Sequence, residues 1–429
     1  MLASSSPMPL LVHSFYTTKS FAVFLFFLLL TLIATFSFPV EAAFRCHPDD
    51  QASLLAFKFG FTSDSSGILH TWNSSTDCCT WNGVSCRADI NNRVTFFYLY
   101  GQPDHPRSFL SGTISPSLTK LQYLEPIHLI NLRNLTGPLP DFFLRLPRLA
   151  YVYLTGNRLS GPIPESIGNM TQLRALGLQG NRFTGQIPSS IEKLTHLDHN
   201  RLTGTIPDFF TAFTNLVILD LSGNKLTGNI PSSVSTLFPT LRYLALGHNH
   251  LTRKIPDFLG KFRILDTLDL SWNNFSGTVP KTFVNLTKIF NLDLSHNHLV
   301  DPFPTLYVKG IESIDLSYNQ FHLVNIPPWI TSSPTIYSLK LAKCGLKLKL
   351  DDWKPSETYF YDYIDFSDNE ITGSPFNILN NTDYLVGFYA LGDKLQFDLG
   401  TLRLPKTLQF LDLSRNLVKE KVPGAVSGL

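Results

Sequence analysis

The segment "LDTLDLSWNNF" (265–275) contains a spacing of leucines and one asparagine that recurs along most of the chain. Its pattern is L-x-x-L-x-L-x-x-N-x-L, and "LRALGLQGNRF" (173–183) repeats it, again with phenylalanine in the last position. Most neighbouring units are 24 or 25 residues apart, and about 13 or 14 units fit between residue 93 and the C-terminus. The asparagines of the pattern are Asn157, Asn181, Asn224, Asn249, Asn273, Asn297, Asn319, Asn369 and Asn416.

Each unit combines a short strand with an inward-turning asparagine. Alternate side chains of a strand point to opposite faces, so the leucines of L-x-L face a core and the residues between them face outward. The asparagine amide can satisfy backbone groups at the bend that follows. One unit cannot close its core alone, and a fixed period of this length is the signature of a leucine-rich repeat. We therefore predict an α/β solenoid over residues 93–429, a right-handed leucine-rich-repeat superhelix with a concave parallel β-sheet.

Two His-Asn-His triplets look at first like a metal or acid–base site. They occur at 248–250 and 296–298, the second in "LDLSHNHLV" (292–300) beside Asp293. The repeat explains both, because the central asparagine belongs to the core and the histidines flank it. The triplets are two repeats apart, about 10 Å at strand spacing, which is too far to share one ion. We expect no metal, no catalytic residues and no other cofactor.

Composition and the N-terminus indicate export. The 429 residues carry a formal net charge of +2 and no Lys/Arg-rich run, so we expect no nucleic-acid partner. The apolar stretch "FAVFLFFLLLTLIATFSFPV" (21–40) leads into small residues at a cleavage position, which predicts a signal peptide over residues 1–42. An uncleaved stretch of this length could instead anchor the chain in a membrane.

Four of the five cysteines lie in one short segment. Adjacent cysteines rarely bond to each other, so Cys78 and Cys79 each need a partner outside the pair. Two such pairings exist with Cys46 and Cys86, and we favour Cys46–Cys78 with Cys79–Cys86. An oxidising secretory compartment would support both bonds. Cys344 stands at an asparagine position of the repeat, where a small buried thiol is expected.

A second phrase, L-x-G-x-I-P, follows most asparagines before residue 300. It appears as "LSGPIPESIG" (159–168) and "LTGNIPSSV" (226–234), with glycine at a turn and proline fixing the backbone after it. This form resembles the plant-specific class of leucine-rich repeats. The segments "CHPDDQASLLAFKFGF" (46–61) and "WNSSTDCCTWNGVSC" (72–86) resemble the N-terminal cap of that class, which we place at residues 43–92.

The resemblance extends to polygalacturonase-inhibiting proteins and to the ectodomains of plant receptor-like proteins. It implies a protein ligand, either a microbial pectin-degrading enzyme or a peptide, or else a cell-wall polysaccharide. It also implies secretion to the extracellular space or cell wall, with a membrane involved only if the N-terminal apolar segment stays uncleaved. Without a catalytic motif we expect a binding protein rather than an enzyme.

Three departures from the family pattern stand out. The interval from Asn181 to Asn200 is only 19 residues, and "EKLTHLDHNRL" (192–202) lacks most of the expected strand. The G-x-I-P phrase decays after about residue 300. Family members end in a cysteine-bearing C-terminal cap, and because no cysteine follows Cys344 we expect that cap to be missing.

The outward positions of the later strands form the candidate binding surface. Aspartates recur between the two strand leucines, and rings recur just before the asparagine. An aspartate row beside a row of rings predicts a partner with a basic patch. The candidate residues are Tyr243, His248, Asp269, Trp272, Asp293, His296, Asp315, Tyr318 and Lys343. The N-x-S/T sequons that predict glycosylation lie at Asn73, Asn134, Asn169, Asn274, Asn285 and Asn380.

Overall fold

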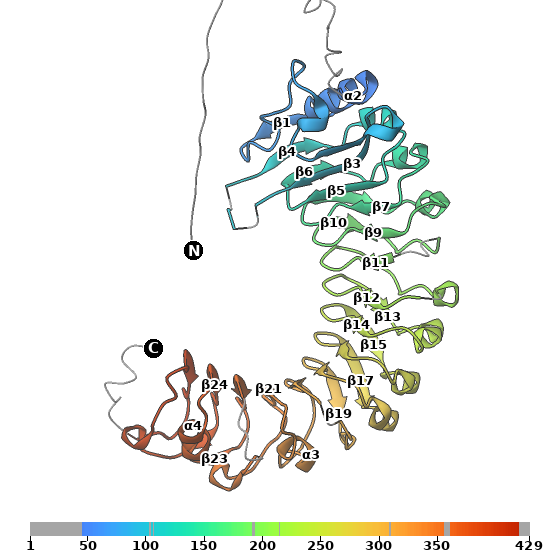
Figure 1. Ribbon diagram of the computed structural model, residues 1–429. Coiled ribbons are helices and arrows are strands. Elements are labelled where there is room, and N and C mark those ends of the chain that lie inside the picture. Colours follow the sequence, from blue (N-terminus) through green and yellow to red (C-terminus); the bar gives the residue numbers. More distant parts are fainter. Residues whose placement is uncertain are drawn as a thin grey trace, which may run out of the picture. The chain divides into compact units, whose positions relative to one another are not determined.

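The computed structural model describes residues 45–419 except 103, 106, 191–193, 214, 309 and 356–360. The predicted signal peptide (1–42) and residues 420–429 lie outside the described residues. The chain from Cys46 onward forms one compact unit, a stack of repeats (Figure 1). Among the described residues, the structure contains no helix with the length and apolar character of a membrane span.

One sheet of fifteen strands runs through the whole stack. Its first strand, β2 (Val84–Arg87), is antiparallel to β3 (Arg93–Tyr100). The others run parallel, one from each repeat, which confirms the predicted solenoid. In sheet order they are β5 (Pro126–Ile130), β7 (Tyr151–Tyr153), β9 (Ala175–Gly177), β11 (Leu194–His196), β12 (Ile218–Asp220), β14 (Tyr243–Ala245), β16 (Thr267–Asp269), β18 (Asn291–Asp293), β20 (Ser313–Asp315), β21 (Ser338–Lys340), β22 (Tyr363–Asp365), β24 (Gly387–Tyr389) and β26 (Phe410–Asp412).

A second strand follows the asparagine position of many repeats, and these strands, together with β1 of the cap, form three smaller sheets. The first contains β1 (Phe61–Asp64), β4 (Leu110–Thr113), β6 (Arg133–Gly137), β8 (Arg158–Pro162) and β10 (Arg182–Thr184). The second contains β13 (Thr227–Gly228), β15 (His250–Arg253), β17 (Asn274–Thr278) and β19 (His298–Val300), and the third contains β23 (Thr372–Gly373) and β25 (Lys394–Leu395).

Short helical segments close the repeats on the outer side of the stack, opposite the main sheet (Figure 1). Two are α-helices, α3 (Pro328–Thr331) and α4 (Phe376–Asn381). The 3-10 segments of the repeats are Pro116–Lys120, Asp141–Arg145, Glu165–Asn169, Phe210–Ala212, Ser232–Leu237, Asp257–Lys261, Lys281–Asn285, Leu350–Asp352 and Leu399–Thr401, and those of the cap are Cys78–Thr80 and Ala88–Ile90.

The inward asparagines form a ladder of hydrogen bonds, as the sequence predicts. The Nδ2 amide of Asn297 donates to the carbonyl oxygens of Leu270, Leu294 and Ser295 at 2.9, 3.1 and 3.0 Å. Its Oδ1 accepts the backbone N–H of Phe275 at 3.0 Å. Each such side chain joins its own repeat to the preceding one, so the ladder ties the bends of the stack together.

The phrase after the asparagine also adopts the expected geometry. Gly185 and Gly277 have φ of 77° and 79°, a conformation that glycine adopts without strain. Cys344 is buried at its asparagine position, where its Sγ lies 3.3 Å from the carbonyl oxygen of Leu316. Burial raises the pKa of this thiol, which fits an inert core residue.

The short repeat keeps a strand, so the prediction that it lacks most of one is wrong. Strand β11 (Leu194–His196) pairs with β9 and β12, although its register against β9 contains an irregularity. Asn200 retains its place in the ladder, with Nδ2 donating to the carbonyl oxygen of Leu178 at 3.0 Å. The shorter length of this repeat instead falls on its outer side, where the described residues between Thr184 and Leu194 form no 3-10 segment.

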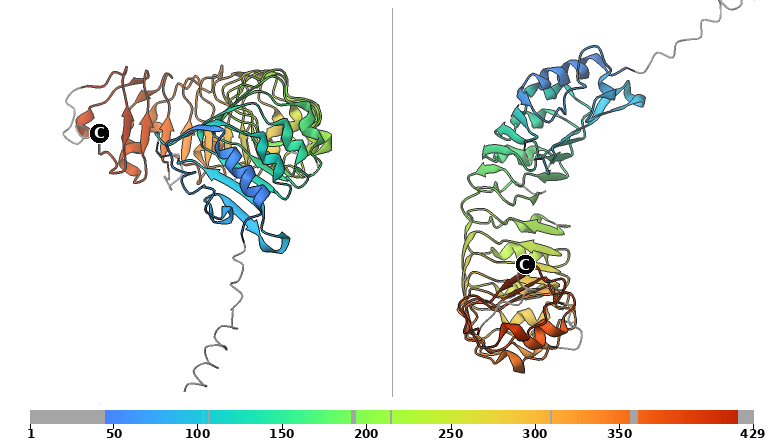
Figure 2. Two further views of the ribbon diagram at one scale, coloured as in Figure 1. Left: turned by 90° about the horizontal axis from the view of Figure 1, so that it is seen from above. Right: turned by 90° about the vertical axis from the view of Figure 1, so that its left-hand side faces the viewer.

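The N-terminal cap covers the first repeat with helix α2 (Pro48–Lys58) (Figure 2). Leu54 and Phe57 are fully buried, and the Phe57 ring packs edge-on against Phe97 of β3 at 5.1 Å. The carboxylate of buried Asp50 accepts two hydrogen bonds from Arg93, at 2.7 and 2.9 Å, and a third from the backbone N–H of Val94 at 2.8 Å. The helix is therefore joined to the sheet by apolar contacts and by a buried ion pair.

The cap contains the two disulfides that the sequence favours. Cys46 is bonded to Cys78 and Cys79 to Cys86. These bonds enclose the Cys78–Thr80 turn and link it to β2 and to the start of α2.

Candidate functional site

The register of the main sheet places the predicted aspartates in one row across the stack. From β12 to β26 the positions directly opposite one another are Asp220, Ala245, Asp269, Asp293, Asp315, Lys340, Asp365, Tyr389 and Asp412. The same row continues toward the N-terminus through Asp220, His196, Gly177, Tyr153, His128 and Tyr98. One row of outward positions is thus aromatic in the first repeats and acidic in the later ones.

One carboxylate oxygen of these aspartates has a local structural role. The Oδ1 atoms of Asp269, Asp293 and Asp315 accept the backbone N–H two residues ahead, at 2.8, 2.9 and 3.0 Å. These bonds satisfy a donor where the strand ends. The recurrence of Asp-x-Ser is therefore explained by the fold, and only the second carboxylate oxygen remains for other groups.

Four rings from consecutive repeats stack on one another beside this row. The centroid of Trp272 lies 5.3 Å from that of His248 and 3.7 Å from that of His296, with ring planes within 13° of parallel. The His296 ring in turn lies 4.5 Å from that of Tyr318. We refer to His248, Trp272, His296 and Tyr318 as the ring stack. Trp272 remains 49% exposed, so the stack presents an aromatic edge to solvent.

The backbone carries these rings in a left-handed conformation. The φ angles of His248, Trp272, His296 and Tyr318 are 54°, 49°, 51° and 54°. Glycine stands at the same repeat position in Gly156, Gly180, Gly223 and Gly392. A bulky residue in this region costs on the order of 1 kcal/mol relative to glycine. The same conformation occurs at the equivalent positions His199, Lys343, Asp368 and Arg415, so it belongs to the repeat itself. What distinguishes the ring stack is that rings occupy this position in four consecutive repeats.

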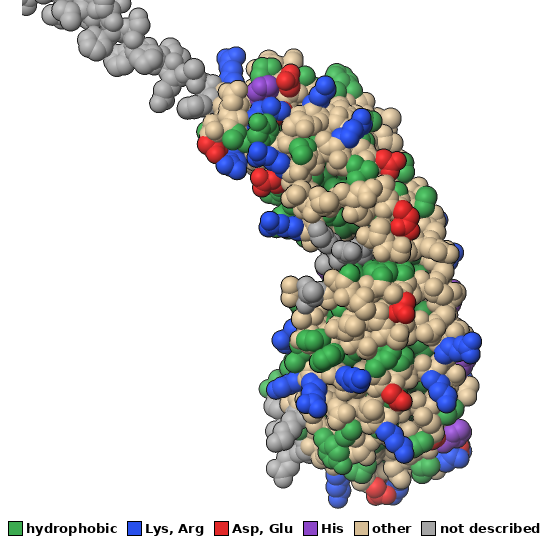
Figure 3. Space-filling view, turned by 90° about the vertical axis from the view of Figure 1, so that its right-hand side faces the viewer, with side chains coloured by type: hydrophobic (Ala, Val, Ile, Leu, Met, Phe, Trp, Pro, Cys, Tyr) green, Lys and Arg blue, Asp and Glu red, His purple; other side chains and the backbone are tan. Residues whose placement is uncertain are grey.

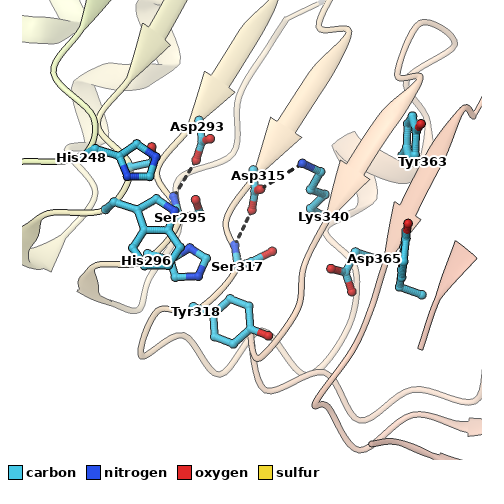
Figure 4. Close-up of a pocket in the computed structure, with 13 residues that line it drawn as sticks. His248, Asp293, Ser295, His296, Asp315, Ser317, Tyr318, Lys340, Tyr363 and Asp365 are labelled. Carbon is cyan, nitrogen blue, oxygen red and sulfur yellow. Dashed lines mark hydrogen bonds and ion pairs between the residues drawn. The ribbon is translucent and has the colours of Figure 1, made fainter. Parts of the chain in front are cut away.

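A hollow of about 490 Å³ lies between the ring stack and the next strands (Figure 4). Six of the nine predicted residues line it, and it is also lined by residues outside that set. The lining comprises His248, Ser271, Trp272, Asp293, Ser295, His296, Asp315, Ser317, Tyr318, Lys340, Tyr363, Asp365 and Tyr389. Asp365 belongs to the aspartate row that the sequence predicts, and Lys340 and Tyr389, which were not selected, share that row, so their strand position was a usable signal.

The electrostatics of the hollow depend on burial. Burial, followed by the charge of Asp315, raises the pKa of the Asp293 carboxyl to about 7. Burial also raises the pKa of Asp365, and it lowers the pKa of His296 and so favours its neutral form. The Nζ of Lys340 lies 3.7 Å from Oδ2 of Asp315. The hollow therefore holds less negative charge near neutral pH than its count of aspartates suggests.

The remaining predicted residues lie outside the hollow. Tyr243 is on β14 and Asp269 on β16, both on the same face of the sheet. Lys343 continues the left-handed row after Tyr318, with φ of 52°. It lines a separate hollow of about 430 Å³ together with His322, Asp368 and Glu370.

The six sequon asparagines differ in exposure. Asn134 and Asn380 are half-buried. Nδ2 of Asn134 donates to Ser111 at 3.2 Å and Oδ1 of Asn380 accepts the N–H of Arg403 at 2.9 Å, while exposed Asn73 also donates its Nδ2, to the carbonyl oxygen of Thr71 at 3.2 Å. The exposed ones are Asn73, Asn169, Asn274 and Asn285, and these are the better candidates for glycans.

Comparisons with known families match both parts of the chain. The family described as Leucine rich repeat N-terminal domain matches residues 47–87, within the predicted cap. The families described as Leucine rich repeat match residues 148–170, 172–194, 192–251 and 239–299.

Among curated proteins, DNA damage-repair/toleration protein DRT100 of Arabidopsis thaliana is 33% identical over 138 residues, which are 30% of this chain and 37% of that protein. The Polygalacturonase inhibitor of Vitis vinifera is 36% identical over 128 residues, which are 30% of this chain and 35% of that protein. The matched part of this chain thus spans little more than a third of each relative's length.

A solved structure extends the likeness over most of the chain. It is the Arabidopsis receptor kinase HAESA in complex with the peptide hormone IDA and the co-receptor SERK1. The likeness covers 87% of this chain and 66% of the HAESA chain, with 27% identity and a TM-score of 0.68. The chain is therefore a leucine-rich-repeat protein with the N-terminal domain that accompanies such repeats, homologous to plant polygalacturonase inhibitors and to DRT100.

Proposed function

We propose that this protein is a secreted binding protein, and that the hollow beside the ring stack holds a basic segment of a protein partner. The observation that carries this proposal is the ring stack, four rings held in a strained backbone conformation next to carboxylates. Aromatic side chains at the centre of an interface contribute most of its binding energy. The disulfides of the cap support secretion, because such bonds persist in oxidising compartments.

The chemistry of the hollow favours a cationic group. Within the described residues, the one ion pair among its lining residues joins Lys340 to Asp315, so that Asp293 and Asp365 form no salt bridge, although the charge of Lys340 also acts on Asp365. A lysine or arginine side chain that entered here would meet these carboxylates and the faces of aromatic rings, both of which attract cations. The outer side of the stack differs from the hollow, because lysine and arginine side chains are spread over that face (Figure 3).

For the target, we propose a microbial polygalacturonase, which the protein would inhibit by covering its cleft. Support comes from the homology to the Vitis vinifera Polygalacturonase inhibitor. The full chain would be produced in plant cells, confirmed as folded by circular dichroism, and titrated against fungal polygalacturonases at about pH 5 while reducing ends are measured. Saturable inhibition that is lost on Trp272→Gly supports the proposal. A folded protein that inhibits none of a panel of these enzymes contradicts it.

The alternative is the ectodomain of a receptor-like protein that senses a peptide. It is favoured by the likeness to HAESA, which was solved with a peptide hormone bound. The inhibition titration distinguishes the two functions, because a sensing ectodomain would bind a basic peptide in the hollow without inhibiting the enzyme.

A second binding function is favoured by a row of arginines on the early repeats. Arg158, Arg182 and Arg201 each follow a ladder asparagine, and they line a hollow of about 630 Å³ together with Arg133. Within the described residues, none of the first three forms a salt bridge. Positive charges repeated at strand spacing suit an acidic cell-wall polysaccharide. Binding of polygalacturonate that weakens steeply with added salt would support this function.

A further inference from the structure

The first three parallel strands carry an aromatic surface that the proposed functions do not use. Its six rings occupy outward positions of β3, β5 and β7. From β16 to β20 the corresponding positions hold no rings, as at Thr267 and Asp269. In other later repeats single rings occupy them, at Tyr243, Tyr363, Tyr389 and Phe410. We refer to this surface as the aromatic platform, and it consists of Phe96, Tyr98, Tyr100, His128, Tyr151 and Tyr153.

Five rings of the platform pack against one another in one continuous layer, namely those of Phe96, Tyr98, Tyr100, His128 and Tyr153. The His128 ring lies edge-on to both neighbours, 5.0 Å from Phe96 and 4.9 Å from Tyr153. Its Nδ1 is 2.8 Å from the hydroxyl of Tyr100, so the rings are joined by a hydrogen bond as well as by contact. Tyr100 is 47% and Tyr151 37% exposed. The ligand would therefore meet rings that are already ordered, which lowers the entropy lost on binding.

Glycine on the next strand lets the layer extend sideways. A Cβ at Gly177 would lie 2.6 Å from Cδ1 of Tyr153, so the tyrosine ring rests across the place where a side chain would stand. Ala175 on the same strand β9 is also small. The platform therefore extends across a fourth strand, β9, whose outward residues here are small.

The platform is uncharged, unlike the later part of the same sheet. Burial lowers the pKa of His128 and so favours its neutral form. Arg93, at the start of β3, is occupied by its ion pair with Asp50. No other outward position of β3, β5 and β7, all of which lie in the described part of the chain, holds a lysine, arginine, aspartate or glutamate. A charged ligand would thus gain no ion pair here.

From these observations we infer a second binding site, in which the aromatic platform stacks the rings of a neutral, extended polysaccharide. A pyranose ring has a face of C–H bonds that packs on the negative face of an aromatic ring, while its hydroxyl groups can bond to phenol oxygens at the rim. Sugars of an extended β-1,4-linked chain advance by about the spacing of neighbouring strands, so successive sugars would meet successive ring rows. The site is independent of the hollow at Trp272 and of the arginine row.

The test is a calorimetric titration of the full-length protein with cellohexaose, a neutral β-1,4-linked probe. Replacing both Tyr100 and Tyr153 by alanine should weaken binding roughly tenfold, since each stacked ring contributes a modest share. Tyr151→Ala, at an exposed position, serves as a second variant that should weaken binding with little effect on folding. Tyr318→Ala is the matched control, because it removes the same kind of ring from the ring stack and should leave cellohexaose affinity unchanged.

Three results would overturn the inference. One is an absence of cellohexaose binding by a protein with native circular dichroism. Another is binding that the Tyr151→Ala and Tyr100/Tyr153 variants leave unchanged. The third is preferential binding of a proline decamer at the platform, which would assign it to proline-rich peptides instead. Oligogalacturonate is measured in parallel to separate the platform from the arginine row. Added salt should weaken the binding of this charged ligand and leave the binding of neutral cellohexaose unchanged.

Discussion

The indole of Trp272 lies nearly parallel to the imidazole of His296, with ring centroids 3.7 Å apart. Both residues have positive φ, a conformation that glycine adopts at the equivalent position of four other repeats. Contact between the rings offsets part of the backbone strain, since stacked aromatic pairs contribute about 0.5–1.5 kcal/mol. The stack is therefore built from residues that a purely structural repeat would not need.

Trp272→Gly should separate binding from stability. Glycine removes the strain of roughly 1 kcal/mol and also removes stacking of similar size, so we expect the melting temperature to change little. Affinity for the partner should fall at least tenfold, as it should for Tyr318→Ala. Thermal unfolding and the inhibition titration measure the two effects. Tyr307→Ala, at an exposed ring outside the stack, should change neither quantity, and an undiminished affinity of Trp272→Gly would exclude the ring stack from binding.

Binding of a basic partner should release a proton from the hollow. The pKa of Asp293 is raised to about 7 in the free protein by burial and by Asp315, and a bound cation would lower it again. The complex then holds fewer protons than the free protein, so affinity should rise as the pH increases from about 5 to 7 and level off above that. Asp293→Asn should flatten this profile. Equal pH profiles for the wild type and this variant would show that Asp293 does not contact the cation.

Asp393 should make the stability of the C-terminal repeats depend on pH. It replaces a ladder asparagine, and its Oδ1 accepts the N–H of Ile371 at 3.0 Å. Its Oδ2 is buried without a hydrogen-bond partner, in the place where Asn369 has a donating Nδ2 amide. A protonated carboxyl could donate there, whereas a carboxylate cannot. Burial accordingly raises the pKa of Asp393 to about 7, with smaller contributions from the charges of Asp368 and Asp365.

The direction in which stability changes with pH follows from this raised pKa. The stabilising contribution of protonated Asp393 is complete below the ordinary carboxyl pKa of 3.8 and is lost as the pH rises through about 7. We expect wild-type protein to lose about 1–3 kcal/mol of local stability between pH 5 and pH 8, measurable by hydrogen exchange in residues 365–416. Asp393→Asn should remove that loss and exceed the wild type at pH 8. A variant less stable than the wild type at both pH values would disprove the proposed hydrogen bond.

Asp50→Ala should weaken the attachment of the cap. It leaves Arg93, whose side chain is 15% exposed, without its carboxylate partner, and breaking a buried ion pair in this way costs about 3–5 kcal/mol. Urea unfolding followed by the fluorescence of the stacked cap tryptophans Trp72 and Trp81 would detect the loss. The control is Asp89→Ala, whose ion pair with Arg87 is exposed and whose removal should leave the transition in place. If both variants unfold alike, the buried pair does not hold the cap.

Sequence reasoning located the elements of the site more reliably than their arrangement. The residues His248, Trp272, His296 and Tyr318 were identified because each precedes a ladder position, and the structure stacks them. Lys340 interrupts the aspartate row and pairs with Asp315, which a pattern search for recurring aspartates passes over. The strand in the short repeat was missed for a related reason, since only pairing with both neighbours shows that Leu194–His196 belongs to the sheet.

The sequence by itself determined the repeat, the core and outward faces of each strand, and the ladder of asparagines. These follow from two short periods, the alternation within a strand and the 24- or 25-residue unit, and both act locally. Only the tertiary structure decided the ring stack, the hollow, the raised pKa of Asp293 and the neutral aromatic platform. Each of these depends on side chains from different repeats meeting in register, and on how much solvent their packing excludes, which no single repeat contains.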